Sequence, residues 1–186
     1  MTDGLDRLVA YHCAPTLMGM KAGNMFSLKR SAYANREERV QAILQLLREK
    51  GLSAKVFHTP WDASLIYLYR GDLLKESLSH PLARSLLASL GYEGQDAEEL
   101  VWQLGRRMES SASFPHEIGL FLGYPPEDVA GFVKHRGAGC KLCGCWKVYG
   151  DVGKAKALFG QYAYCRFACL KRLKSGMTLD EVACAI

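Results

Sequence analysis

Apolar residues recur at helical spacing along much of the chain, most clearly over residues 35–51. Asn35 and Glu38 stand at the two positions of a capping box, and Gly51 is a typical residue at a helix end. Between them, one side of the segment is apolar at Val40, Ile43, Leu44 and Leu47. This spacing predicts an amphipathic helix that buries one face.

Further segments have the same spacing or typical helix-start residues. They predict helices over residues 5–13, 72–92, 96–110, 114–137, 151–176 and 178–186. Pro81 interrupts the second of these, and Pro125 with Pro126 divides the fourth, because proline removes a backbone hydrogen bond inside a helix. Thr178 and Glu181 form the capping-box pattern at the start of the last one.

Four segments favour β-structure instead: residues 24–28, 53–59, 64–70 and 145–150. Only "PWDA" separates the second from the third, which predicts a hairpin-like antiparallel pair. Residues 14–23, with Pro15, Gly19 and Gly23, are predicted to form a loop. The order of elements predicts an α+β fold: a small antiparallel or mixed sheet of split βαβ type, many helices, and a helical insertion before the last strand. We expect residues 1–186 to form a single domain.

The composition fits a globular protein, with 23% charged residues and no apolar run of the roughly 18 residues that a membrane span needs. The first residues lack the basic and then apolar layout of a secretory signal, so we expect a cytoplasmic protein without membrane association. Seven cysteines in a reducing compartment are then predicted to be thiols, metal ligands or redox groups rather than disulfides. Walker, Gly-x-Gly-x-x-Gly and Gly-x-Ser-x-Gly motifs are absent, which disfavours nucleotide hydrolysis and serine hydrolase chemistry.

Positive charge is concentrated in the C-terminal third of the chain. Residues 134–174 hold ten Lys or Arg and a single acid, Asp151, whereas the whole chain has a net charge of only +5. Such a region is typical of a surface that attracts an acidic protein or an anionic ligand, and equally of a solvated basic helix face. No nucleic-acid-binding motif accompanies it, so nucleic acid is not an expected partner.

The stretch "GAGCKLCGCWKVYG", residues 137–150, is the densest in candidate chemistry. Cys140 and Cys143 have Cys-x-x-Cys spacing, and Cys165 and Cys169 lie four apart on one face of a predicted helix. Two such pairs could bind zinc or an iron–sulfur cluster, or one pair could be redox-active. The alternative, which the apolar stripe around Cys165 favours, is that these cysteines serve as turn or core residues.

Two other segments combine reactive side chains. In "YHCAPTLMGMKAGN", Cys13 is a candidate nucleophile, since a nearby Lys21 would lower the pKa of its thiol; the alternative is an ordinary helix end. In "SFPHEIGLFLGYPPEDVAGF", His116 and Glu117 stand at a predicted helix start, where the histidine could transfer a proton or bind a metal or haem. A structural histidine is the competing interpretation.

The chain resembles the uncharacterised bacterial family named domain of unknown function 3793 in three stretches, which are followed by a helix with a cysteine. In chain order they are "HCAPTLMGMKAGNMF", "FPHEIGLFLGYPPEDVAGF" and "CKLCGCWKVYGD". The resemblance extends from Tyr11 to Cys165. It implies a cytosolic protein of mainly anaerobic bacteria and an association with flavodoxin and iron-uptake functions, without a known reaction.

The resemblance also implies which positions follow the family pattern: His12, Cys13, Pro15, Lys21, Asn24, His116, Glu117, Gly119, Gly123, Tyr124, Pro125, Cys143, Gly144, Trp146, Tyr149 and Cys165. Position 145 departs from it, since the pattern has an aromatic residue where this chain has Cys145, and Cys169 is an individual addition. The departure shifts weight to four other cysteines: Cys13, Cys140, Cys143 and Cys165.

Together these features predict a redox- or metal-linked small-molecule enzyme with one shared pocket. Its catalytic residues would be Cys13, Lys21, His116 and Glu117. Its cofactor-binding residues would be His12, Asn24, Tyr124 and Trp146, and its metal ligands Cys140, Cys143 and Cys165. Zinc, an iron–sulfur cluster and haem are the cofactors that such side chains bind. In this enzyme the basic face of residues 134–174 would dock an acidic electron carrier such as a flavodoxin. The alternatives are a non-catalytic binding module for an anionic ligand or tetrapyrrole, and an adaptor that docks an acidic partner protein through its basic C-terminal helix.

Overall fold

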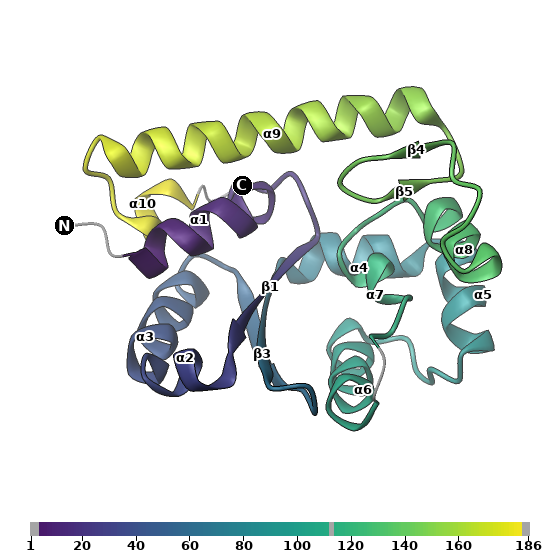
Figure 1. Ribbon diagram of the computed structural model, residues 1–186, viewed down its shortest axis with the longest axis horizontal. Helices are drawn as coiled ribbons and strands as arrows, with labels where there is room; N and C mark the ends of the chain where they lie inside the picture. Colours follow the sequence, from purple (N-terminus) through teal and green to yellow (C-terminus); the bar gives the residue numbers. More distant parts are fainter. Residues whose placement is uncertain (1–3, 112–113, 184–186) are drawn as a thin grey trace.

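A three-stranded antiparallel sheet lies at the centre of the fold in the computed structural model, which describes residues 4–111 and 114–183 (Figure 1). Its strands, in the spatial order β1-β3-β2, are β1 (Gly23–Lys29), β2 (Ser53–His58) and β3 (Ala63–Tyr69). β1 and β2 both run antiparallel to β3, so they are parallel to each other, and the connection between them is helical. This is the predicted split βαβ arrangement, and the α+β fold class is confirmed.

The central strand β3 is buried on both faces, because its side chains alternate between two hydrophobic clusters. Ile66 and Leu68 contribute to the first cluster, and Tyr67 and Tyr69 to the second. Neighbouring strands alternate in the same way, with Phe26 of β1 in the first cluster. A strand that packs on both sides is expected to be largely apolar, as "LIYLY" of residues 65–69 is.

Different sets of helices cover the two faces of the sheet (Figure 1). The first cluster includes residues of α1 (Gly4–Leu17), α2 (Arg30–Ala34), α3 (Glu37–Arg48), α9 (Val152–Lys174) and α10 (Leu179–Val182). The second includes residues of α4 (Gly71–Ser79), α5 (Pro81–Ser89), α6 (Ala97–Ser110), α7 (Ile118–Phe121) and α8 (Pro126–His135). None of the helices in the described residues is both long and apolar enough to cross a membrane.

Helix α9 runs along one edge of the molecule and reaches both sets of helices (Figure 1). Its last half packs on α1 and α10, and its first half lies over a small hairpin of β4 (Leu142–Cys143) and β5 (Lys147–Val148). Trp146, Val148, Ala155 and Tyr162 form a third apolar cluster between the hairpin and α9. β5, the predicted last strand, therefore pairs with β4 rather than joining the main sheet.

Two local predictions are wrong. The segment predicted as a loop from residue 14 continues α1 as far as Leu17, although Pro15 lies inside it. Proline cannot donate to the carbonyl four residues earlier, and here Arg166 of α9 donates to that carbonyl, the Tyr11 oxygen, at 3.2 Å. Asn35 is not a helix N-cap but the C-cap of α2, a short helix that the pattern did not indicate.

The buried Arg70, directly after β3, ties the end of α1 to the sheet. Its guanidinium donates to the carbonyl oxygens of Thr16 and Leu17, both at 2.8 Å, and its backbone N–H donates to Ala22 at 2.9 Å. Asn24 adds a second tie, since its side-chain oxygen accepts from the Thr16 hydroxyl at 2.8 Å. These bonds hold the loop of residues 18–22 at both of its ends.

We expect Arg70→Met to lower the free energy of unfolding by about 3 kcal/mol, because it leaves two buried carbonyl oxygens at a helix end without these donors. Urea unfolding monitored by circular dichroism measures the change. Arg84→Met is the matched control: Arg84 is exposed and bonded to Gln95, so its loss should cost less than about 0.5 kcal/mol. Equal effects of the two substitutions would contradict the structural role of Arg70.

Candidate functional site

Two hollows meet at the ring of Tyr124, in the turn between α7 and α8. The larger, which we call the Lys21 hollow, has a volume of about 610 Å³ and is lined by residues of the loop 18–22, α4, the α7–α8 turn and α9. The smaller, the His116 hollow, has a volume of about 290 Å³ and lies between the segment 114–119, α8 and the β4–β5 hairpin. The chemistry-bearing side chains of the fold gather here.

Lys21 is the most unusual residue of the larger hollow. The residue is only 6% exposed, and its ammonium lies 4.6 Å from the ring centre of Tyr124 and 5.5 Å from that of Tyr162. It forms no hydrogen bond or ion pair with any described residue. Every fully buried side-chain nitrogen and oxygen of the described residues has a partner, so this unpartnered ammonium must keep contact with the hollow.

Burial lowers the pKa of Lys21 from 10.5 to about 8, because the low-dielectric surroundings disfavour its charged form. The thiols of Cys13 and Cys145 act in the opposite direction but do not offset the burial. Burial also raises the pKa of Tyr124 to about 12, and it raises the pKa of Tyr162 for the same reason. Both tyrosine hydroxyls therefore stay neutral at physiological pH. The hollow thus presents a cation against neutral rings, and the carboxylate of Glu76, which also lines it, forms no ion pair with Lys21.

Glycines allow the segments of the site to approach closely. Gly123 has a φ of 71°, which favours glycine, and a Cβ on it would lie 2.9 Å from the Cβ of Ala22. This contact places the neighbouring Tyr124 ring against Lys21. In the hairpin, a Cβ on Gly144 would lie far too close to the Phe159 ring of α9, so only glycine lets the hairpin tip lie on that helix.

The His116 hollow combines an imidazole, two thiols and aromatic walls. The exposed His116 packs edge-on against Phe132 at 5.0 Å between ring centres. Cys143 and Cys145, both exposed, line the same hollow from the hairpin. The Trp146 ring stacks on Tyr124 at 4.8 Å, which links this hollow to the Lys21 hollow.

Asp128 of α8 anchors the hairpin that forms one wall of this hollow. The residue is 2% exposed, and one carboxylate oxygen accepts from the Trp146 indole at 2.6 Å. The other accepts from the backbone N–H groups of Tyr149 and Gly150, each at 2.7 Å. A buried carboxylate with three donors fixes the orientation of Trp146 and, through it, of Tyr124.

The structure brings together some of the predicted site residues. Lys21 and Tyr124 line the first hollow, and His116, Cys143 and Trp146 line the second, with Tyr124 common to both. Segments far apart in the sequence therefore converge, although on two hollows that share Tyr124 rather than on the one predicted pocket.

Cys13 does not reach either hollow. It is fully buried in the first hydrophobic cluster, and burial raises the pKa of its thiol to about 12 despite the opposing effect of Lys21. The predicted lowering of this pKa is wrong, because desolvation of a thiolate in the core outweighs the attraction of a cation that is itself desolvated. A buried, protonated thiol is unsuited to the predicted nucleophilic role.

His12, Asn24 and Glu117 also lie outside the two hollows. His12 stacks on Phe26 at 5.6 Å, and burial followed by the nearby Arg166 lowers its pKa. Asn24 serves as the tie to Thr16. Glu117 is buried, accepts from the Tyr92 hydroxyl at 3.0 Å and lies 3.8 Å from Arg107, so it joins α7 to α6.

The predicted metal ligands do not form a cluster. Cys165 is buried in the first hydrophobic cluster, whereas Cys143 is exposed in the hairpin and Cys140 lies in the loop before it. Across residues 4–111 and 114–183, no group of three or more His, Cys, Asp or Glu side chains could hold a metal ion. The cysteines within these ranges are all free thiols.

One family profile, described as "Protein of unknown function (DUF3793)", matches residues 9–183. The chain belongs to this family. The match includes the three stretches on which the resemblance rests, and the lining residues of both hollows lie within it. No curated protein matches the chain, and no solved structure does.

Sequence reasoning missed four residues that build the site of this DUF3793 protein: Arg70, Asp128, Cys145 and Tyr162. The burial of Arg70 could have been predicted, since a charged residue directly after a largely apolar strand is expected to be buried and paired. Asp128 follows "PPE" at a helix start, which resembles an ordinary first-turn acid. Cys145 was set aside as a departure from the family pattern, and Tyr162 as one member of an apolar helix stripe.

In the folded DUF3793 protein, we expect iodoacetamide at neutral pH to label Cys143 and Cys145 but not Cys13, Cys165 or Cys169. The first two thiols are exposed, and the other three are buried. Peptide mass spectrometry resolves each site, and labelling in guanidinium chloride provides the control in which all react. Labelling of Cys13 in the folded state as fast as Cys143 would show that the core placement of Cys13 is wrong.

Proposed function

We propose that this DUF3793 protein binds a small anionic molecule in the Lys21 hollow. The observation that carries the proposal is the buried ammonium of Lys21, which faces a hollow of about 610 Å³ without an acidic partner among the described residues. A buried charge without a counter-ion is costly. An anionic group of a ligand would supply the missing counter-charge and regain that cost on binding.

The walls of the hollow indicate the rest of the ligand. Apolar side chains of Met20, Leu73 and Leu158 and the two tyrosine rings provide a surface for an apolar or aromatic body. Polar groups of Ser77, Ser79 and His80 stand at the side formed by the end of α4, together with the exposed carboxylate of Glu76, which an anionic group bound at Lys21 would have to avoid. A carboxylate or phosphate attached to a flat body, as in flavin nucleotides and tetrapyrroles, matches this combination in charge and polarity.

Lys21→Met is expected to abolish anion binding and to stabilise the free protein. The lowering of the Lys21 pKa from 10.5 to about 8 corresponds to a destabilisation of roughly 3 kcal/mol at neutral pH, which the substitution removes. The substitution also loses the two cation–π contacts, which costs at most about 2 kcal/mol. We therefore expect a net gain of about 1 kcal/mol, measured by urea unfolding. Thermal shift with flavin mononucleotide, ATP, haemin and phosphate measures binding, since a ligand at a hundred times its dissociation constant adds roughly 2.7 kcal/mol.

Lys134→Met is the control, because Lys134 is exposed on α8 and does not line the hollow. It should change neither stability nor binding.

For the wild-type protein, anion affinity should be constant up to about pH 8 and then fall by about tenfold per pH unit, as the free ammonium deprotonates. Stability of the free protein should rise over the same range, since the unfolded state then binds the extra proton. Unchanged binding by Lys21→Met, or no shift with any of the four probes, would contradict the proposal.

A second candidate function is thiol-dependent redox chemistry in the His116 hollow. It is favoured by the presence of His116, Cys143 and Cys145 around one hollow next to Lys21. In this proposal a thiolate would act as nucleophile or ligand, and the imidazole would accept or donate the proton. The described residues offer no group of three or more ligands for zinc or an iron–sulfur cluster. Those cofactors, haem, and a cytoplasmic, anaerobic setting are therefore proposals from the sequence alone.

Metal analysis and an absorption spectrum of anaerobically purified protein test the redox proposal. If it is correct, the wild-type protein carries metal or an absorbing group, and Cys143→Ser with Cys145→Ser removes it. Cys169→Ser is the control, because that thiol is buried in the core away from both hollows. A colourless, metal-free wild-type protein whose ligand binding survives the double substitution would contradict the redox proposal and leave the anion-binding one intact.

A further inference from the structure

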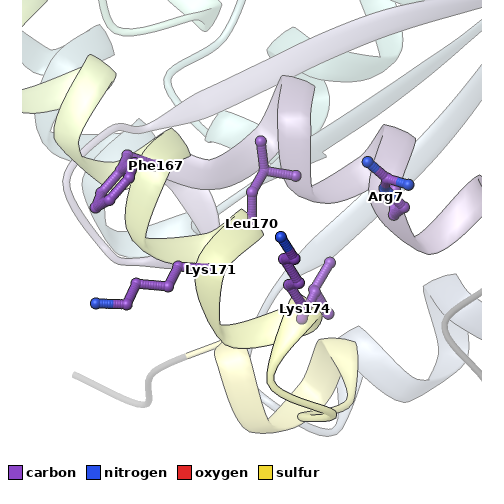
Figure 2. Close-up of a pocket in the computed structure, with 6 residues that line it drawn as sticks. Arg7, Phe167, Leu170, Lys171 and Lys174 are labelled. Atoms are coloured by element: carbon purple, nitrogen blue, oxygen red, sulfur yellow. The ribbon is translucent and has the colours of Figure 1, made fainter.

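The last turns of α9 form a groove that shares no lining residue with the Lys21 hollow or the His116 hollow. It has a volume of about 610 Å³ and is lined by Arg7, Phe167, Leu170, Lys171, Leu173 and Lys174. Figure 2 shows Leu170 and Lys174 toward α1, where Arg7 stands opposite, while Phe167 and Lys171 point outward from α9. The side chains spread over a surface rather than converge on one point, which suits an extended partner better than a small molecule.

The charge around this groove is of one sign. Helix α9 contains no Asp or Glu, and its basic residues are Lys154, Lys156, Arg166, Lys171, Arg172 and Lys174. The described acids of α1 and α10 are engaged elsewhere. Asp6 of α1 pairs with Arg39 at 2.9 Å, while in α10 Glu181 accepts from the Thr178 backbone at 2.7 Å and Asp180 is hydrogen-bonded with the Thr178 side chain. Arg7, Lys171 and Lys174 therefore form no ion pair with any acid of the described ranges, and the groove presents a positive surface.

Aromatic rings are exposed on the same surface. Tyr164 and Phe167, three positions apart and hence neighbours on the helix, are 67% and 64% exposed. Tyr11 of α1 is also exposed, and its ring lies 4.8 Å from the guanidinium of Arg166. Tyrosine, phenylalanine and arginine are enriched at the centres of protein interfaces, where large rigid rings bury area at little entropic cost.

The charge and the packing of α9 select among occupants. A second copy of the chain would place one positive helix against another, which is repulsive. A bilayer surface attracts helices that offer a continuous apolar face, whereas the apolar stripe of α9 at Tyr162, Cys165, Cys169 and Leu173 is buried in the protein itself. A protein segment with carboxylates on either side of an apolar residue complements both the cations and the rings.

We propose that the α9 groove docks an acidic, amphipathic segment of a partner protein. An apolar side chain of the segment would pack on Phe167 and Leu170, and its carboxylates would pair with Lys171, Lys174 and Arg7. This interaction surface is independent of ligand binding in the Lys21 hollow. The two sites use opposite halves of α9, since Leu158 and Tyr162 line the hollow and the residues from Phe167 onward line the groove.

Fluorescence anisotropy with a fluorescein-labelled peptide in which Leu and Phe alternate with pairs of Glu tests the proposal. The wild-type protein should bind this peptide and not its counterpart with Gln at every Glu. Lys171→Glu with Lys174→Glu should weaken binding about tenfold or more, and Phe167→Ala by a similar factor. Binding should also weaken steeply as ionic strength rises, because exposed charges are then screened.

Matched controls separate this groove from general electrostatic attraction. Lys75→Glu with Lys134→Glu reverses two exposed cations outside α9, and Trp102→Ala removes a ring that is 61% exposed on α6; both should bind as the wild type does. The proposal is overturned if these controls weaken binding as much as the groove variants, or if the Gln peptide binds equally well. It is also overturned if duplex DNA or phosphatidylserine vesicles compete for the groove more tightly than the acidic peptide, or if the protein dimerises through α9.

Discussion

Holding a positive charge inside a folded protein without a counter-charge is costly, and much of this fold is arranged around one such charge. Lys21 lies against two tyrosine rings that offer it only partial compensation. The loop that carries it cannot move away, because Arg70 and Asn24 hold its two ends. The closeness of Gly123 to Ala22 then presses Tyr124 onto the ammonium. Stability lost in this way is common at functional sites of proteins.

Helix α9 connects this site with the rest of the molecule. Its buried face extends from Ala155 at one end to Leu173 at the other, so one rigid element contributes to two hydrophobic clusters. Tyr162 faces Lys21, while the exposed face further along carries Phe167 and the basic side chains. A ligand site and a docking surface on a single helix would be held at a constant separation.

The features that local sequence predicted well are those that neighbouring residues alone decide. The pairing of β2 with β3 follows from two apolar runs separated by four residues, and the Thr178–Glu181 capping box from two side chains in one turn. The prediction of Asn35 as a helix N-cap was wrong, because the short helix α2 ends there and has Asn35 as its C-cap. The loop predicted around Pro15 was wrong, because a side chain of α9, far along the sequence, replaces the hydrogen bond that proline cannot make.

The site divides in the same way. Residue types and spacing, with the family resemblance, were enough to select five residues that line one or other of the two hollows, although their predicted roles stay predictions: Lys21, His116, Tyr124, Cys143 and Trp146. They could not distinguish Cys13, whose burial depends on how α1 packs on α9, nor reveal that Asp128 orients Trp146 across the hairpin. By itself the sequence determined most of the helices and strands, the α+β class and the supply of reactive groups, because these depend on periodicity and composition. Only the tertiary structure decided which thiols are exposed, which charges are paired and which pKa values shift, because burial and distance are properties of packing.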